Sequence, residues 1–132
     1  MAKAAKKPEQ PPSKRTMAVQ QAIEAKPGAT AHPATVRGVT LYKVMNKMFA
    51  ILSVRNDAFV ILKSDPHLAE VLREQYNGIG HRSHLDRRFW IAVTIDADVP
   101  LKQTRALIDQ SYDLIREGLT RKQQAELDSL SR

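Results

Sequence analysis

Three short apolar segments follow one another in the first half of the chain, and they restrict its fold more than any other feature. They are "GVTLYKV" (38–44), "KMFAILSV" (47–54) and "AFVILK" (58–63). All contain β-branched and aromatic residues, and short connections such as Met45-Asn46 join them, as is typical of hairpins. The sequence therefore predicts an antiparallel meander of three strands.

The second and third of these strands are predicted to lie in the centre of the sheet. In 47–54, Phe49 and Ile51 share one alternating face, and the residues between and beside them, which are also apolar, share the other. Segment 58–63 shows the same pattern. Strands that are apolar on both faces are typical of sheets covered, at least in part, on both sides.

Helices are predicted on both sides of the meander. The first follows Thr16, which can cap it, and ends at the "KPG" turn (26–28). A loop that contains Pro33 is predicted after this turn. "SDPHLAEVLREQYNG" (64–78) is the clearest helix, because Asp65 can cap it and apolar residues recur along one face.

Beyond this helix the sequence predicts one or two further strands and two more helices. "FWIAVTI" (89–95) alternates as a strand does, and a long helix follows from about Leu101. Thr120 with Gln123 forms a possible capping box for a last helix. The strands thus cluster first and are joined by hairpins. The predicted fold class is α+β, with an antiparallel sheet packed against helices in one domain.

Basic charge is divided between the amino-terminal tail and the middle of the chain. Residues 1–15 hold five Lys/Arg, one Glu and three prolines, and little there can be buried. This composition predicts a disordered basic tail, followed by a single domain over 16–132. Residues 37–95 hold nine basic and five acidic side chains, so the predicted domain is only mildly basic. Attraction of such charge to polyanions is sequence-independent.

No arrangement typical of an enzyme, a metal site or a cofactor site is recognisable. There is no cysteine, and the glycines form no phosphate-binding loop. His81 and His84 have no third metal ligand nearby in the sequence. Ser111 and Tyr112 lie within the predicted long helix, where we expect a small residue allowing close helix–sheet contact and a buried ring with a hydrogen-bonded hydroxyl. We therefore predict a non-enzymatic protein.

The sequence also bears on the cellular compartment. No apolar run is long enough to span a bilayer, and the amino terminus lacks the hydrophobic region of a secretory signal. Together with the lack of cysteine, these features favour a cytoplasmic protein.

The segment "HRSHLDRRFWIAV" (81–93) places the only tryptophan, Trp90, beside several basic residues. Two interpretations stay open. As the entrance to a buried strand, the segment would bury Trp90, in keeping with the usual burial of tryptophan. As an interface, it would combine aromatic and basic side chains as single-strand binders do. Basic residues at strand ends, such as Lys43 and Lys63, also have two interpretations. They are either solvated charges or contacts to phosphate groups.

Four segments resemble the successive signature blocks of a known family. They are "NKMFAIL", "FVILKSDPHLAEVLREQYNGI", "HLDRRFWIAVTIDADVP" and "LIDQSYDLI". In this order and spacing they are similar to the MmcQ/YjbR family of small bacterial proteins, over about residues 23–119. The family places an asparagine and a basic residue ahead of its tryptophan, where this chain has Asp86 to Phe89. The resemblance implies a compact, secretion-chaperone-like α/β fold, described as a double wing, whose relatives are commonly labelled DNA-binding.

These observations together predict weak, phosphate-directed DNA binding through hairpin tips and the sheet surface. The candidate contact residues are Lys43, Lys47, Lys63, Arg82, His84, Arg87, Arg88 and Trp90. The alternatives are a protein–protein adaptor, which a secretion-chaperone-like fold would suit, and a small-molecule binder with its site near Trp90. Steep salt dependence is expected of phosphate binding and not of an apolar protein interface.

Overall fold

The computed structural model describes residues 11–55 and 57–130, within which four helices and six strands form. In chain order they are α1 (Lys14–Glu24), β1 (Ala29–Pro33), β2 (Val39–Val44), β3 (Lys47–Ser53), β4 (Phe59–Lys63), α2 (Pro66–Gln75), β5 (Ile79–Gly80), β6 (Trp90–Thr94), α3 (Leu101–Glu117) and α4 (Arg121–Leu130). Residues 1–10 of the predicted tail lie outside the described residues.

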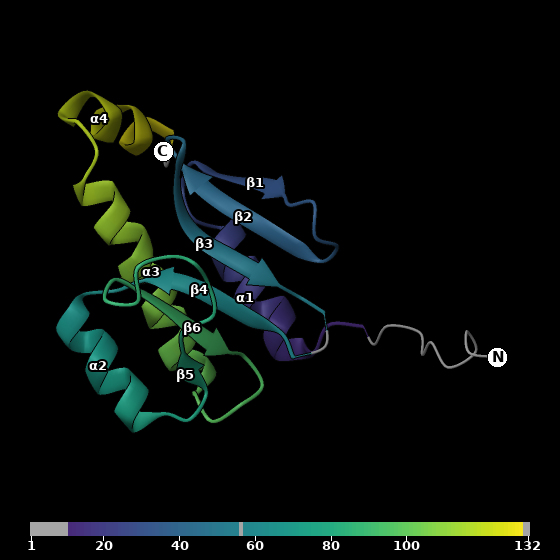
Figure 1. Ribbon diagram of the computed structural model, residues 1–132. Coiled ribbons are helices and arrows are strands. Elements are labelled where there is room, and N and C mark those ends of the chain that lie inside the picture. Colours follow the sequence, from purple (N-terminus) through teal and green to yellow (C-terminus); the bar gives the residue numbers. More distant parts are fainter. Residues whose placement is uncertain (1–10, 56, 131–132) are drawn as a thin grey trace.

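The strands form one antiparallel sheet in the order β1-β2-β3-β4-β6-β5 (Figure 1). The three strands predicted first are β2, β3 and β4, which are sheet neighbours, so the predicted meander is confirmed. Met45 and Asn46 make the β2–β3 turn with positive φ angles of 48° and 66°, as a two-residue hairpin turn of type I′ requires. The predicted α+β class with an antiparallel sheet is confirmed as well.

Strand β1 occupies the segment that was predicted to be a loop. It pairs with β2 from Ala29 opposite Val44 to Pro33 opposite Thr40. Proline lacks the N–H that a central strand needs, but β1 lies at the edge of the sheet and Pro33 is its last residue. The prediction of a loop is therefore wrong, because pairing with β2 orders a segment whose own sequence carries little strand signal.

Helix α1 begins earlier than predicted. Its N-cap is Ser13 rather than Thr16, since Ser13 Oγ accepts a hydrogen bond from the backbone N–H of Thr16 at 3.0 Å. The prediction of Thr16 as the cap is therefore wrong. Lys14 and Arg15, which were predicted to lie in the tail, belong to the helix, and the Arg15 guanidinium donates to the carbonyl of Val99.

The predicted starts of the other helices are confirmed. Asp65 caps α2 by accepting hydrogen bonds from two backbone N–H groups of the first turn, at 3.0 and 3.1 Å. Helix α3 begins at Leu101. Thr120 and Gln123 form a capping box at the start of α4, in which each side chain accepts from the other residue's backbone N–H at 3.1 Å.

Helices α1 and α3 contact each other and lie against one face of the sheet, where the core forms (Figure 1). One face of α3, which includes Ile108, Tyr112 and Ile115, is buried. The Tyr112 ring lies edge-on to Phe49 with a centroid distance of 5.4 Å, and its hydroxyl donates to the carbonyl of Pro27 at 2.6 Å. The predicted structural role of Tyr112 is thus confirmed.

A β-bulge interrupts β3 at Phe49. Tyr42 pairs with Ala50, but the next residue of β2 pairs with Met48, which leaves Phe49 as the extra residue. Phe49 and Ala50 are both fully buried, although simple alternation predicted that Phe49 would share a face with Ile51. That prediction is wrong, because the bulge turns the Phe49 side chain toward Tyr112 of α3.

Ser111 of α3 binds backbone groups beside this bulge. Its hydroxyl donates to the carbonyl of Phe49 at 2.6 Å and accepts from the N–H of Lys63, on the neighbouring strand β4, at 2.9 Å. The Ser111 side chain is fully buried. A small residue at this position was predicted to allow close contact between helix and sheet, and its hydroxyl also joins α3 to two strands.

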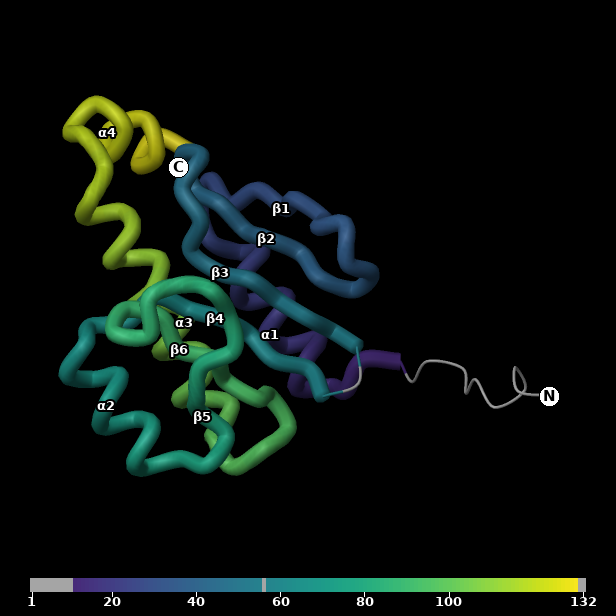
Figure 2. Tube along the Cα trace, viewed as in Figure 1, coloured from purple at the N-terminus to yellow at the C-terminus, as the bar shows by residue number. Residues whose placement is uncertain are grey.

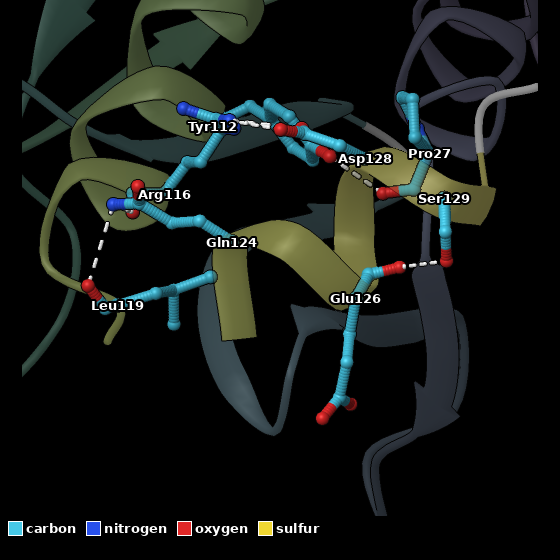
Figure 3. A network of polar contacts seen from close by, with 8 residues as sticks. All are labelled: Pro27, Tyr112, Arg116, Leu119, Gln124, Glu126, Asp128 and Ser129. Atoms are coloured by element: carbon cyan, nitrogen blue, oxygen red, sulfur yellow. Dashed lines mark hydrogen bonds and ion pairs between the residues drawn. The ribbon is translucent and has the colours of Figure 1, made fainter. Parts of the chain in front are cut away.

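Helix α4 folds back against the carboxyl end of α3 through a polar network (Figure 3). The Gln124 amide donates to the carbonyls of Arg116 and Leu119 at 3.0 and 3.3 Å. Arg116 in turn donates to both carboxylate oxygens of Asp128 at 2.8 and 2.9 Å. Leu127 is buried, so apolar packing and polar contacts together hold α4.

We predict that Ser111→Ala lowers the free energy of unfolding by about 2–3 kcal/mol, because two backbone groups would lose their partner in a site that water does not reach. Urea unfolding followed by circular dichroism measures the change. Ser129→Ala serves as the control, since the Ser129 hydroxyl is exposed and donates only to the carbonyl of Glu126. A stability of the Ser111 variant equal to that of the control would contradict the bridging role.

Candidate functional site

Basic and aromatic side chains gather on the sheet face that lies opposite to the core. Leu62 of β4 and Ile91 of β6 are buried in the core. Because side chains alternate along a strand, their neighbours in sequence, Lys63 and Trp90, point to the opposite face. The same alternation places Lys43 of β2 there. We call this the open face.

Four side chains form a row across one end of the open face. Lys43 of β2 pairs with Met48 of β3, and Lys63 of β4 pairs with Trp90 of β6. We call these four residues the basic row, and each of them is half-buried. Lys47, at the start of β3, is exposed beside the row. None of the residues of β2, β3, β4 and β6 is acidic, so no carboxylate from these strands competes for the lysines.

The next row of the open face is apolar and only partly covered. Leu41, Ile51, Ile61 and Ala92 are aligned by the strand register. Ile61 and Ala92 are 4% and 2% exposed, whereas Leu41 and Ile51 are half-buried. The cover over β4 and β6 is residues 81–89, the β5–β6 segment, which crosses in front of these strands (Figure 2). The open face is therefore most accessible over β2 and β3, and the basic row, two of whose residues lie on β4 and β6, is half-buried.

Internal hydrogen bonds shape the β5–β6 segment around Asp86. The Asp86 carboxylate accepts from the backbone N–H of Arg88 at 2.9 Å and from its guanidinium at 3.1 and 2.7 Å. The Asp86 carbonyl accepts from the N–H groups of Phe89 and Trp90, both at 3.0 Å. Hydrogen bonds from Arg88 lower the pKa of the Asp86 carboxyl from 3.8 to about 2.

Arg73 of α2 fixes the end of this segment. Its Nη2 donates to the carbonyl of Arg87 at 2.6 Å and to the carbonyl of Trp90 at 2.9 Å. Arg73 was not among the residues predicted from the sequence. Its position in the last turn of α2, directly after the buried Leu72, was the one available signal, and this position alone does not distinguish a structural arginine from a solvated one.

The structure separates the predicted contact residues into two groups. Lys43, Lys63 and Trp90 come together in the basic row, with Lys47 beside them. The other group lies on the β5–β6 segment and consists of Arg82, His84, Arg87 and Arg88, all exposed.

The members of the second group differ in their contacts. The Arg82 guanidinium lies over the ring of Phe59, 4.6 Å from its centroid, and so at the opposite end of β4 from Lys63. Arg88 is engaged by Asp86. His81, which lies in the same segment but is not one of these candidates, contacts the carbonyl of Leu85 through its Nε2 at 2.6 Å. Trp90 is half-buried, so its expected burial holds only in part.

Within the described residues, no helix combines the length and the hydropathy that crossing a bilayer would need. The fold and the open face define a class of small α+β protein, built from one antiparallel sheet with its helical core on one face and a partly covered, basic and apolar surface on the other. The YjbR family model matches residues 24–114. The chain belongs to the YjbR family.

Relatives and solved structures agree with this assignment. The Escherichia coli K12 protein named uncharacterized protein YjbR is 37% identical over 89 residues, which is 67% of this chain and 75% of that protein. A second relative, uncharacterized protein YbdF of Escherichia coli O157:H7, is 29% identical over 85 residues, 64% of this chain and 70% of that protein.

A Deinococcus radiodurans protein with the DUF419 domain has a similar crystal structure, with a TM-score of 0.78 and 26% identity over 90% of this chain and 91% of that one. A Pseudomonas syringae protein shares the fold, with a TM-score of 0.64 and 22% identity over 77% of this chain and 98% of that one.

We predict that carboxyl NMR gives Asp86 a pKa near 2 and that Arg88→Ala returns it toward 3.8. Because the folded-state pKa is depressed, ionised Asp86 stabilises the fold above about pH 4, and this contribution is lost as the pH falls toward 2. Arg87→Ala is the matched control, since Arg87 does not contact the Asp86 carboxylate. An Asp86 pKa that stays depressed in the Arg88 variant would refute this assignment.

Proposed function

We propose that the protein binds DNA through the basic row of its open face, mainly by contacts to phosphate groups. The observation that carries this proposal is the alignment of Lys43 and Lys63 with Trp90 on strands that contain no acidic residue. Lysine contacts to phosphate are strong at low salt and do not depend on sequence. Exposed Lys47 extends the positive surface to the β2–β3 hairpin.

Single-stranded DNA suits this surface better than a duplex. A sheet face with a half-buried tryptophan can hold unstacked bases, because every base has a face that stacks on an aromatic ring. Trp90 is the only tryptophan of the chain, so one base at most would stack on indole here. We infer weak binding with little sequence preference.

Two arginines of the β5–β6 segment, Arg82 and Arg88, contribute less to this proposal than the lysines. Arg88 already pairs with Asp86 at 2.7 Å, and Arg82 lies on the ring of Phe59 at the far end of the strand. Each would have to exchange an existing contact for a phosphate. Lys43 and Lys63 form no ion pair within the described residues, so phosphate contact displaces only water there.

A protein partner is the second candidate, and the apolar row favours it. Half-exposed Leu41 and Ile51 lie in the middle of the open face, where an apolar segment of a partner could cover them. Such an interface would depend little on salt concentration, whereas phosphate binding weakens steeply with salt.

We predict that changing Lys43 and Lys63 together to alanine weakens binding of a single-stranded oligonucleotide. The slope of log affinity against log salt should flatten by roughly 0.7 for each phosphate that the variant no longer neutralises. Fluorescence of Trp90 offers a direct readout, because a base stacked in the basic row would quench it. The Lys102→Ala, Lys122→Ala pair is the matched control, since it removes the same charge from exposed positions on α3 and α4.

The tail is tested separately by a chain that starts at Pro11, because a start at Thr16 would remove the Ser13 cap of α1. Equal weakening of binding in both double variants would show that only total charge matters. No binding by the shortened chain even at low salt would overturn the proposal, and the apolar partner would then become the leading candidate.

A further inference from the structure

A pocket of about 510 Å³ lies between helix α2 and the β5–β6 segment. Its lining residues are Pro66, Glu70, Arg73, Glu74, Arg87 and Arg88. The two glutamates lie four residues apart on α2, so they occupy neighbouring positions on one face of that helix. Arg87 and Arg88 come from the other side, on the β5–β6 segment. The pocket thus has an acidic wall and a basic wall.

Arg73 carries a positive charge that only neutral groups contact. Its Nη2 binds two backbone carbonyls, and its Nε is buried without a hydrogen-bond partner among the described residues. Burial lowers the pKa of the Arg73 guanidinium, the nearby charge of Arg87 lowers it further, and Glu70 has a smaller opposite effect. The Arg73 side chain starts on α2, but its guanidinium reaches the carbonyls of Arg87 and Trp90 and therefore lies near the β5–β6 segment. Neither Arg73 nor Arg87 forms an ion pair within the described residues.

The opposite walls do not neutralise each other directly. Among the described residues, no ion pair joins Glu70 or Glu74 to an arginine of the pocket. Arg88 is neutralised by Asp86, which leaves Arg73 and Arg87 facing the two glutamates. A simple anion such as phosphate would match the arginines but would be repelled by the glutamates. A ligand that carries both charges matches both walls.

We propose that this pocket binds an amino acid, with its carboxylate against Arg73 and Arg87 and its ammonium group against Glu70 and Glu74. The exposed Arg87 guanidinium can bind the carboxylate through paired, charge-assisted hydrogen bonds, and its planar fork fixes the orientation of the carboxylate. Arg73 adds positive charge beside it, because its Nη2 already donates to two backbone carbonyls and its Nε is buried. The inference concerns a different surface from the basic row, so it stands independently of DNA binding.

Isothermal titration calorimetry of the full chain tests the proposal with linear amino acids of increasing charge separation: glycine, β-alanine, 4-aminobutanoate and 6-aminohexanoate. Butanoate, butylamine and inorganic phosphate serve as ligands with one kind of charge. We expect saturable binding of at least one amino acid, and binding about tenfold weaker or more for each ligand with one kind of charge, because each lacks one of the two contacts.

Variants then test which charged residues bind the two ends of the amino acid. Arg87→Gln and the Glu70→Gln, Glu74→Gln pair should each weaken amino-acid binding about tenfold or more, while Arg105→Gln and Glu126→Gln, which change exposed charges on other helices, should not. Thermal unfolding checks that each variant stays folded.

Three results would overturn the proposal. The first is no saturation by any amino acid up to about 10 mM, and the second is phosphate or butanoate binding as tightly as the amino acids. The third is equal weakening by the control variants.

Discussion

The hydrogen bonds of Ser111 join the helical layer to the sheet where β3 departs from regular pairing. The bulge at Phe49 would leave strand backbone groups buried without partners, and the serine hydroxyl binds one group on each of two strands. Because these backbone groups are hydrogen-bonded, the Phe49 ring can turn into the core against Tyr112. The Tyr112 hydroxyl in turn donates to the carbonyl of Pro27, in the turn before β1. One buried serine thus connects α3, β3 and β4, and its neighbour Tyr112 extends the connection to the edge of the sheet.

The same bulge decides which side chains reach the open face. Because Phe49 and Ala50 both lie in the core, Met48 falls on the opposite face and takes its place beside Lys43. Without the extra residue, strict alternation would put Met48 in the core and Phe49 on the open face. The composition of the proposed DNA-binding surface is therefore a consequence of how the core packs.

Two different surfaces result from the path of the chain after α2. The β5–β6 segment crosses in front of β4 and β6, so the open face is most accessible over β2 and β3, while the basic row is half-buried. Arg73 holds that segment by its backbone carbonyls, and Arg73 also lines the charged pocket beside α2. The proposed phosphate-binding surface and the charged pocket are therefore formed by different residues.

The sequence by itself determined the meander, the class of the fold, most helix starts and the family. Turn residues and caps act within a few positions, so "SDP" and the Thr120–Gln123 pair predict local structure without knowledge of the rest. It also identified Lys43, Lys63 and Trp90 as candidates.

Only the tertiary structure decided that these three side chains share one row, because strand register depends on partners far away in the sequence. Strand β1, the Phe49 bulge and the position of Arg73 likewise depend on partners: β2, Ser111, and the carbonyls of Arg87 and Trp90. Local sequence specifies these features weakly, and long-range hydrogen bonding and burial settle them.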